Sequence, residues 1–110
     1  MAPKLFTIKK RSTFLMVRNE GFYIKGKNIN VQILHNQKLE KSIGVGYTAS
    51  KKIGNAVKRN KAKRIMRELA RKIIINGKIN SYYVLIAKSS LLDEKFSNLI
   101  VELKEKINDK

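Results

Sequence analysis

The segment KKIGNAVKRNKAKRIMRELARK, residues 51–72, places a dense positive charge on a stretch that has the apolar spacing of a helix. Ten of its 22 residues are Lys or Arg, and Glu68 is its only acid. Ile65, Leu69 and Ile73 recur at intervals of four, which is the spacing of one helix face. Like charges so close together repel one another, so packing of the apolar face has to stabilise the helix. The segment therefore predicts a long helix that buries one face and presents cations on the other.

Asn55 is a good N-cap residue, and we expect the helix to run from about Ala56 to Ile75. At about 100° per residue, the apolar residues lie within roughly 60° of Ala62. A run of charges is usually a solvated helix face, but such faces normally mix the two signs. The nearly unmixed charge here favours a face that binds an anion. That face carries Asn60, Lys63, Arg64, Arg67 and Arg71, with Arg59 and Lys61 on its two flanks.

The whole chain is strongly basic and has the size of one small domain. It has 110 residues, of which 43% are apolar, and a net charge of +17, so we expect a single domain over residues 1–110. Five of the eight acids lie in the last 18 residues, which leaves the basic excess to the rest of the chain. This charge favours a polyanionic partner, with nucleic acid as the first candidate and an anionic membrane surface as the second. The basic helix lacks the Trp- or Phe-rich face of interfacial helices, which disfavours the membrane.

Few residues could carry catalysis or hold a metal ion. The chain has no cysteine and one histidine, His35, so disulfides, thiolate sites and a protein-held zinc ion are not expected. The acids are few and most lie near the C-terminus, so no catalytic constellation can be assembled from them. No apolar run is long enough to span a membrane or to form the core of a signal peptide, and we expect a cytoplasmic protein.

Two further helices are expected. Residues 9–21 have the pattern of a short helix with Ser12 or Thr13 as its cap and Gly21 at its end. Residues 93–107 have the spacing of an amphipathic helix with acids in its first turn, where the helix dipole favours them.

Three strands are expected between these helices. Apolar residues alternate over 28–35 and 42–49, and residues 81–88 are apolar on both faces, which is typical of a central strand. Gly44 and Gly46 share one face of the second strand and allow a close approach to its backbone. The order α-β-β-α-β-α predicts an α+β fold, an α/β sandwich in which the second and third strands are parallel neighbours.

The central segment SKKIGNAVKRNKAKRIMRE, residues 50–68, closely resembles the signature of the bacterial ribonuclease P protein component. That family carries the pattern Lys-Lys-x-Gly-Asn-Ala-Val-x-Arg-Asn-Arg-x-Lys-Arg-x-x-Arg on a basic helix. The segment IKKRSTFLMVRNEG, residues 8–21, resembles the first helix of the family. Lys61 stands where the family has the second Arg of its Arg-Asn-Arg triplet, and Arg18 where it often has an aromatic residue. The matching residues are Lys51, Lys52, Gly54, Asn55, Ala56, Val57, Arg59, Asn60, Lys63, Arg64 and Arg67.

The resemblance implies a small sheet with helices packed on it, in which a left-handed crossover joins two parallel strands through the basic helix. It also implies the small subunit of a ribonucleoprotein that removes the 5′ leader from precursor transfer RNA. The catalyst of that enzyme is its large RNA, with Mg²⁺ held by the RNA and the substrate. The resemblance therefore implies no catalytic residue, no protein-held metal and no small-molecule substrate for this chain.

Two RNA-binding surfaces are implied as well. A cleft between the first helix and the sheet would hold the single-stranded leader, with Lys10, Arg11 and Phe14 at its wall. The basic motif would contact the catalytic RNA. The residues expected in that contact are Lys51, Lys52, Asn55, Arg59, Asn60, Lys61, Lys63, Arg64, Arg67 and Arg71. Size, charge and the lack of catalytic groups leave one alternative open, which is another RNA-binding or ribosome-associated structural protein.

Overall fold

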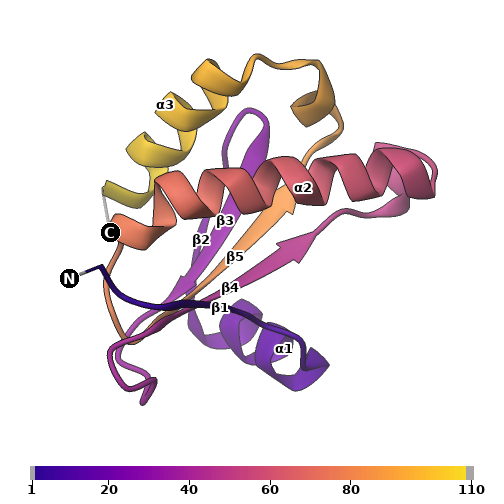
Figure 1. Cartoon of the computed structure of the whole chain (residues 1–110). Helices are drawn as coiled ribbons and strands as arrows, with labels where there is room; N and C mark the ends of the chain where they lie inside the picture. Colours follow the sequence, from indigo (N-terminus) through magenta and orange to yellow (C-terminus); the bar gives the residue numbers. More distant parts are fainter. Residues whose placement is uncertain (1, 109–110) are drawn as a thin grey trace.

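The structure is a computed structural model that describes residues 2–108 as five strands, three α-helices and three short 3₁₀ turns (Figure 1). The expected helices and strands occur in the expected order, with an additional strand on either side of the first helix. The strands are β1 (Leu5–Thr7), β2 (Phe22–Ile24), β3 (Ile29–Leu34), β4 (Ile43–Thr48) and β5 (Ser81–Ala87). The helices are α1 (Arg11–Glu20), α2 (Ala56–Lys72) and α3 (Phe96–Asn108), and the 3₁₀ turns are Lys51–Ile53, Ile74–Asn76 and Ser89–Asp93.

All five strands join one sheet in the order β1-β4-β5-β3-β2. β5 is the central strand and pairs antiparallel with β3 and parallel with β4, where Gly46 lies opposite Val84. The predicted parallel pairing and the central place of the last strand are therefore confirmed. β4, α2 and β5 form the crossover that the resemblance implies, and its left-handed sense stays a prediction.

Helices cover both faces of this sheet, with α2 and α3 on one face and α1 on the other (Figure 1). Side chains of β5 alternate between the two sides. Tyr83 and Leu85 belong to the main core under α2 and α3, whereas Val84 packs with Ile8 and Val17 in a smaller cluster under α1. The predicted α+β sandwich is thereby confirmed.

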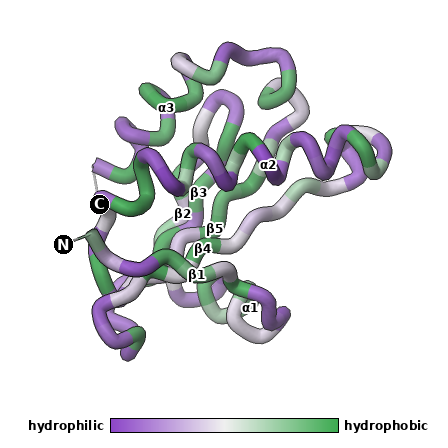
Figure 2. Tube along the Cα trace, in the orientation of Figure 1, coloured by the Kyte–Doolittle hydropathy of each residue, from purple (hydrophilic) through white to green (hydrophobic). Residues whose placement is uncertain are grey.

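The apolar stripe of α2 packs on the sheet as the sequence predicts. Ala62, Met66, Leu69 and Ala70 have no exposed surface and belong to the same cluster as Val45 of β4. Along the hydropathy-coloured tube, apolar and hydrophilic residues alternate with the turns of this helix (Figure 2). Burial of the stripe fixes the rotation of α2 and so decides where its cations point.

The end of α2 differs from the prediction. The helix stops at Lys72 and not at Ile75, because the chain tightens into the 3₁₀ turn Ile74–Asn76. This turn buries Ile74 completely, and the backbone N–H of Gly77 donates to its carbonyl at 2.7 Å. A tight last turn leads the chain away toward β5.

The start of α1 also differs. Lys10 occupies the cap position without a side-chain cap bond, and Ser12 and Thr13 lie inside the first turn, so the predicted caps were wrong. The helix starts here because of Ile8, the residue that follows β1. Ile8 is 5% exposed, and its N–H donates to the carbonyl of Val45 at 2.9 Å. This anchor determines where the chain leaves the sheet and hence where the helix begins.

α3 begins at Phe96, so Asp93 and Glu94 precede its first turn, and the predicted acidic first turn was wrong. The 3₁₀ turn Ser89–Asp93 takes up Asp93 and delays the helix. Glu94 still satisfies donors at the helix start. It accepts hydrogen bonds from the Asn98 side chain at 2.9 Å and the Lys95 backbone N–H at 3.0 Å. These hydrogen bonds lower the pKa of Glu94, and the bond from Asn98 has the largest effect.

The two edge strands were missed because each has only three residues, too few to show alternation. Gly21 ends α1 as predicted, and β2 starts at the next residue. β1 pairs with β4 alone and β2 with β3 alone. These short strands decide the shape of the surface beside α1.

Glu102 ties α3 to the start of β3, which gives a first testable prediction. Its carboxylate accepts from the backbone N–H groups of Asn28 (2.9 Å) and Ile29 (3.0 Å) and from the Asn28 side chain (2.8 Å). Glu102→Gln removes the negative charge and replaces one accepting oxygen by an amide NH₂, which faces N–H groups and cannot accept from them. We therefore expect the free energy of unfolding to fall by about 1.5 to 3 kcal/mol. Urea unfolding checks this. The matched control Glu105→Gln changes an exposed residue of the same helix, and an equal effect of both changes would contradict the structural role of Glu102.

Candidate nucleic-acid interface

The turn before α2 is built by the motif residues themselves. Ser50 Oγ accepts a hydrogen bond from the Lys52 N–H at 3.3 Å, and Asn55 Oδ1 caps the helix by accepting from the Lys58 N–H at 3.0 Å. Gly54 has a φ of 138°, and a Cβ there would lie 2.6 Å from the Lys58 side chain. Gly54 is thus required by the backbone, and Asn55 is required to start the helix.

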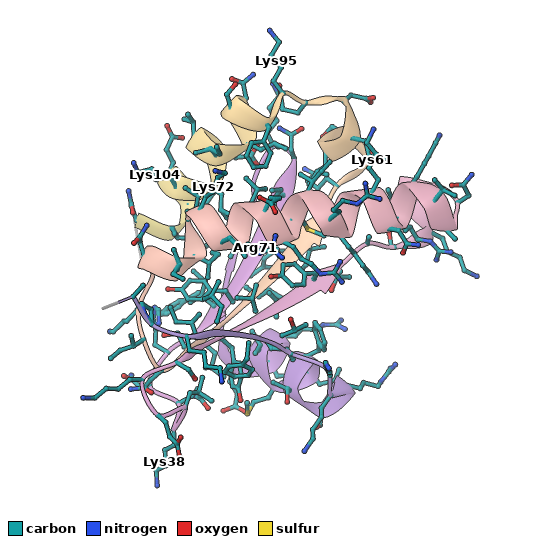
Figure 3. The ribbon with its side chains drawn as sticks, in the orientation of Figure 1. Lys38, Lys61, Arg71, Lys72, Lys95 and Lys104 are labelled. Atoms are coloured by element: carbon teal, nitrogen blue, oxygen red, sulfur yellow. The ribbon has the colours of Figure 1, made fainter. Side chains whose placement is uncertain are left out.

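The predicted RNA-contacting residues all lie outside the core. Arg59 and Lys63 are half-buried, and the other eight are exposed. Arg71 extends from α2 on the side of β1, whereas Lys61 and Lys72 lie on the side of α3 (Figure 3). The cations therefore project from α2 toward both β1 and α3, and Lys61 lies on a different side of the helix from Arg71. Contact of these residues with RNA stays a prediction.

Very little of this charge is neutralised within the protein. Between residues 2 and 108, the ion pairs within 4.0 Å are Lys27 with Glu94, outside α2, and Arg71 with Glu68 within it. The remaining cations of α2 have no carboxylate partner in this part of the chain. Such a surface attracts phosphate groups and releases their counterions on binding.

Tyr47 of β4 contacts the cationic side of α2, a role that the sequence analysis did not predict. The Arg67 guanidinium carbon lies 5.6 Å from the centre of the Tyr47 ring, a cation–π contact that holds the arginine beside β4. Burial raises the pKa of Tyr47, and the positive charges of Arg67 and Arg71 oppose that rise. The only sequence signal is that Tyr47 continues the alternation of β4 after Val45.

A groove of about 740 Å³ lies on the opposite face of the sheet, between α1 and the strands. Its floor follows the register of the sheet, in which Gly46, Val84, Gln32 and Tyr23 lie side by side across four strands. No acid lines this groove, so its surface is cationic, apolar or neutral. The lining residues are Lys9, Arg11, Phe14, Leu15, Arg18, Tyr23, Gln32, Thr48, Val84 and Ile86.

Phe14 enters the groove by lying directly on Gly46. A Cβ at position 46 would come within 2.5 Å of the Phe14 ring, so this glycine leaves the space that the aromatic side chain needs. The close approach predicted for this strand face is therefore made by Phe14. Arg11 lines the groove as predicted, but Lys10 does not and lies in a neighbouring hollow with Phe6 and Thr13.

This contact gives a second prediction. Gly46→Ala places a methyl group against the Phe14 ring, and we expect overpacking to cost about 1 to 3 kcal/mol of unfolding free energy. Phe14→Ala vacates that space, so the double variant Gly46→Ala/Phe14→Ala should lose less than the sum of the single changes. Urea unfolding of the four proteins measures the coupling. Additive losses would show that Phe14 does not rest on Gly46.

Tyr23 forms the far wall of the groove and was also missed, because it lies on the short β2. Tyr23 is 55% exposed. Its hydroxyl oxygen accepts from the Asn30 side chain at 3.0 Å, and Asn30 accepts in turn from the Gly26 N–H at 3.0 Å. The bond from Asn30 occupies one acceptor position of the hydroxyl and leaves its O–H able to donate to another group. The groove thus has one aromatic ring on α1 and a second on the sheet, although Arg18 stands where the resemblance implies an aromatic residue.

Residues 2–108 contain no cluster of three or more His, Cys, Asp or Glu side chains placed to hold a metal ion. His35 is part of the fold, with Nδ1 2.7 Å from Ser81 Oγ and its ring against Tyr83. None of the helices formed by these residues has the length and apolar character needed to cross a membrane.

A basic helix with little internal neutralisation on one face of a sheet and an acid-free aromatic groove on the other define a small α+β RNA-binding protein. The chain belongs to the ribonuclease P family, whose model matches residues 2–109. It is 31% identical over 102 residues to the "Ribonuclease P protein component" of Caulobacter vibrioides, covering 92% of this chain and 68% of that protein. The corresponding protein of Bartonella quintana is 36% identical over 112 residues, with 94% and 81% covered. The solved structure of the Staphylococcus aureus RNase P protein superposes with a TM-score of 0.81 at 25% identity over 94% of each chain.

Proposed function

We propose that this protein promotes removal of the 5′ leader from precursor transfer RNA by binding two RNAs at once. Through its family, the chain is an RNA-binding subunit of ribonuclease P, a ribonucleoprotein endoribonuclease of transfer RNA 5′ processing whose catalytic part is the RNA. The observation that carries the proposal is the placement of two basic surfaces, the acid-free groove and the exposed side of α2, on opposite faces of one sheet. One face can hold the catalytic RNA while the other holds the substrate.

The groove suits the single-stranded leader. Unpaired bases can stack on exposed aromatic rings, and Phe14 and Tyr23 flank the groove floor. Gln32 lies next to Tyr23 and offers both a donor and an acceptor to the edge of a base. Arg11 and Arg18 line the same groove and are available to the phosphates that connect the bases.

The α2 face suits the folded catalytic RNA. Arg64 and Arg67 project planar guanidinium groups that can bind phosphate in a bidentate manner. Lys61 supplies the compact charge of an ammonium group at the position where the resemblance implies the planar guanidinium group of an arginine. Because the cations extend over several turns of a rigid helix, they can contact phosphates of more than one RNA segment.

In this proposal, Mg²⁺ is held by the RNA and the substrate phosphates. The cations of this chain lower the repulsion between the two RNAs, which reduces the magnesium concentration needed to bring them together. The relatives of this chain are bacterial proteins, and bacteria make precursor transfer RNA in the cytoplasm, so we propose that the protein acts there.

Leader-dependent affinity is the measurement that tests the proposal. The protein assembled with a bacterial ribonuclease P RNA should bind precursor transfer RNA more tightly than the same transfer RNA without its leader. Phe14→Leu keeps an apolar side chain on Gly46 but removes the ring, and should lower this leader-dependent gain by about fivefold or more. Phe22→Leu, on β2, is the matched control and should preserve the gain. Equal affinity for the two transfer RNAs would contradict the proposal, and association with ribosomes that survives high salt would then favour a ribosomal structural role.

A further inference from the structure

The edge strand β1 lies between the two proposed RNA-binding surfaces. In Figure 1 it passes between α1 and α2, and it pairs only with β4. A hollow lies on each of its faces. The α1-side hollow, of about 320 Å³, is lined by Phe6, Thr7, Ile8, Lys9, Lys10, Thr13 and Tyr82. The α2-side hollow, of about 200 Å³, is lined by Leu5, Phe6, Thr7, Tyr47, Arg67 and Arg71.

These hollows lie between the groove and the basic helix. The two hollows share Phe6 and Thr7, and the α1-side hollow shares Lys9 with the groove. A chain leaving the groove past Lys9 therefore enters the α1-side hollow, crosses β1 and arrives beside Arg67 and Arg71. We call this route the β1 path.

The lining of the β1 path has the chemistry of the groove itself. No acid lines either hollow, although two other hollows of the described surface contain acids: Glu40 in one, and Glu94, Glu102 and Glu105 in the other. Phe6 is 36% exposed and lies edge-on to Tyr82, with ring centres 6.3 Å apart. The path thus offers an aromatic surface between two groups of cations, as single-stranded nucleic-acid sites do.

The backbone of β1 adds donors along this route. The carbonyl of Lys4 accepts from Ile43, and the N–H of Ile8 donates to Val45, so alternate residues of the strand face β4. The N–H groups of Leu5 and Thr7 consequently lie on the open edge of the sheet. Backbone N–H groups are common ligands of phosphate oxygens.

We propose that single-stranded RNA bound in the groove continues along the β1 path, with one base stacked on Phe6 and one phosphate held between Arg67 and Arg71. Tyr47 positions Arg67 for that phosphate through the cation–π contact. This inference rests on the proposed function of the groove and extends it. The protein then engages a longer leader than the groove alone can hold, and the leader reaches the same helix that binds the catalytic RNA.

Unstructured oligoribonucleotides of increasing length, labelled for fluorescence anisotropy, test the inference. We expect the affinity of the wild-type protein to keep rising with length after the groove is filled. Phe6→Leu retains an apolar contact with Tyr82 but removes the ring, and should lower the affinity for long oligonucleotides by about fivefold or more. The shortest oligonucleotides should bind both proteins alike. Phe22→Leu, at the opposite edge of the sheet, should bind every length as the wild type does.

The outcomes distinguish a failure of the β1 path from a failure of the groove function. If short oligonucleotides bind in a Phe14-dependent manner but Phe6→Leu changes nothing, the β1 path is overturned and the groove function stands. If Phe14→Leu has no effect on any length, the groove function has failed and the path fails with it. Photocrosslinking with single 4-thiouridines gives an independent measurement. Crosslinks from the added nucleotides to residues 5–7 support the path, whereas crosslinks from them only to groove residues overturn it.

Discussion

Replacing both Arg64 and Arg67 with alanine should weaken the binding of ribonuclease P RNA by about 100-fold or more, because each loses a charge-assisted bond worth about 1.5 to 3 kcal/mol. The two residues lie on the exposed face of α2 and have no carboxylate partner among residues 2–108. The slope of log affinity against log salt should fall by about 0.7 to 0.9 for each phosphate contact removed. Titration at several salt concentrations measures both quantities.

The matched control removes the same charge from another surface. Lys95→Ala/Lys104→Ala changes two exposed residues near α3 and within it, away from the β1 side of α2 (Figure 3). Its effect should be much smaller, because charges are screened over about 8 Å at physiological salt. If both double variants lose affinity equally, net charge and not the α2 face governs binding. Wild-type affinity and salt slope in the Arg64/Arg67 variant would remove the role assigned to that face.

Leu69→Ala should lower the free energy of unfolding by about 2 to 5 kcal/mol, because it opens a cavity in the main core. Leu69 has no exposed surface and lies in the stripe by which α2 packs on the sheet. A loss of this size should lower the melting temperature by about 10 °C or more. Thermal and urea unfolding measure the change. Val57→Ala, at a side chain that is 75% exposed on the same helix, is the control and should stay within about 0.5 kcal/mol of wild type.

RNA binding distinguishes this packing effect from an effect on the interface. Leu69→Ala retains every cation of α2, so below its melting temperature it should bind RNA much as the wild type does. Saturating RNA should also raise its melting temperature, since a ligand that binds only the folded state stabilises it. A Leu69→Ala protein as stable as wild type would contradict the packing assigned to α2.

The two faces of α2 explain how a chain with a net charge of +17 can fold around its most basic segment. The buried stripe stabilises the helix, while repulsion between neighbouring cations costs only a few tenths of a kcal/mol per pair. Bound phosphates remove that repulsion. Folding and RNA binding therefore depend on opposite sides of the same helix.

α2 could be predicted from the sequence because its pattern is long and its caps are chemically distinct. Asn55 accepts the cap bond expected of it, and Ala62, Met66 and Leu69 are buried as their spacing indicates. The parallel neighbours β4 and β5 could be predicted because a long helix joins two strongly apolar strands. A close approach to the backbone could be predicted from Gly46, and Phe14 makes that approach.

The parts that could not be predicted depend on contacts between distant segments. β1 and β2 are too short for a pattern, so Tyr23 and Phe6 could not be placed on the sheet from sequence. Lys10 was expected in the groove, but the anchoring of Ile8 on β4 turns it into the hollow beside β1. Tyr47 could be recognised as a support for Arg67 only once α2 was seen to cross β4.

The central claim is tested most directly by cleavage of a precursor transfer RNA with a bacterial ribonuclease P RNA at low magnesium, with and without this protein. We predict that the protein restores cleavage at the mature 5′ end and that it cleaves nothing when the RNA is left out. If the protein binds the RNA but leaves the cleavage rate unchanged, the α2 face is only a general RNA-binding surface and the account of the groove is contradicted.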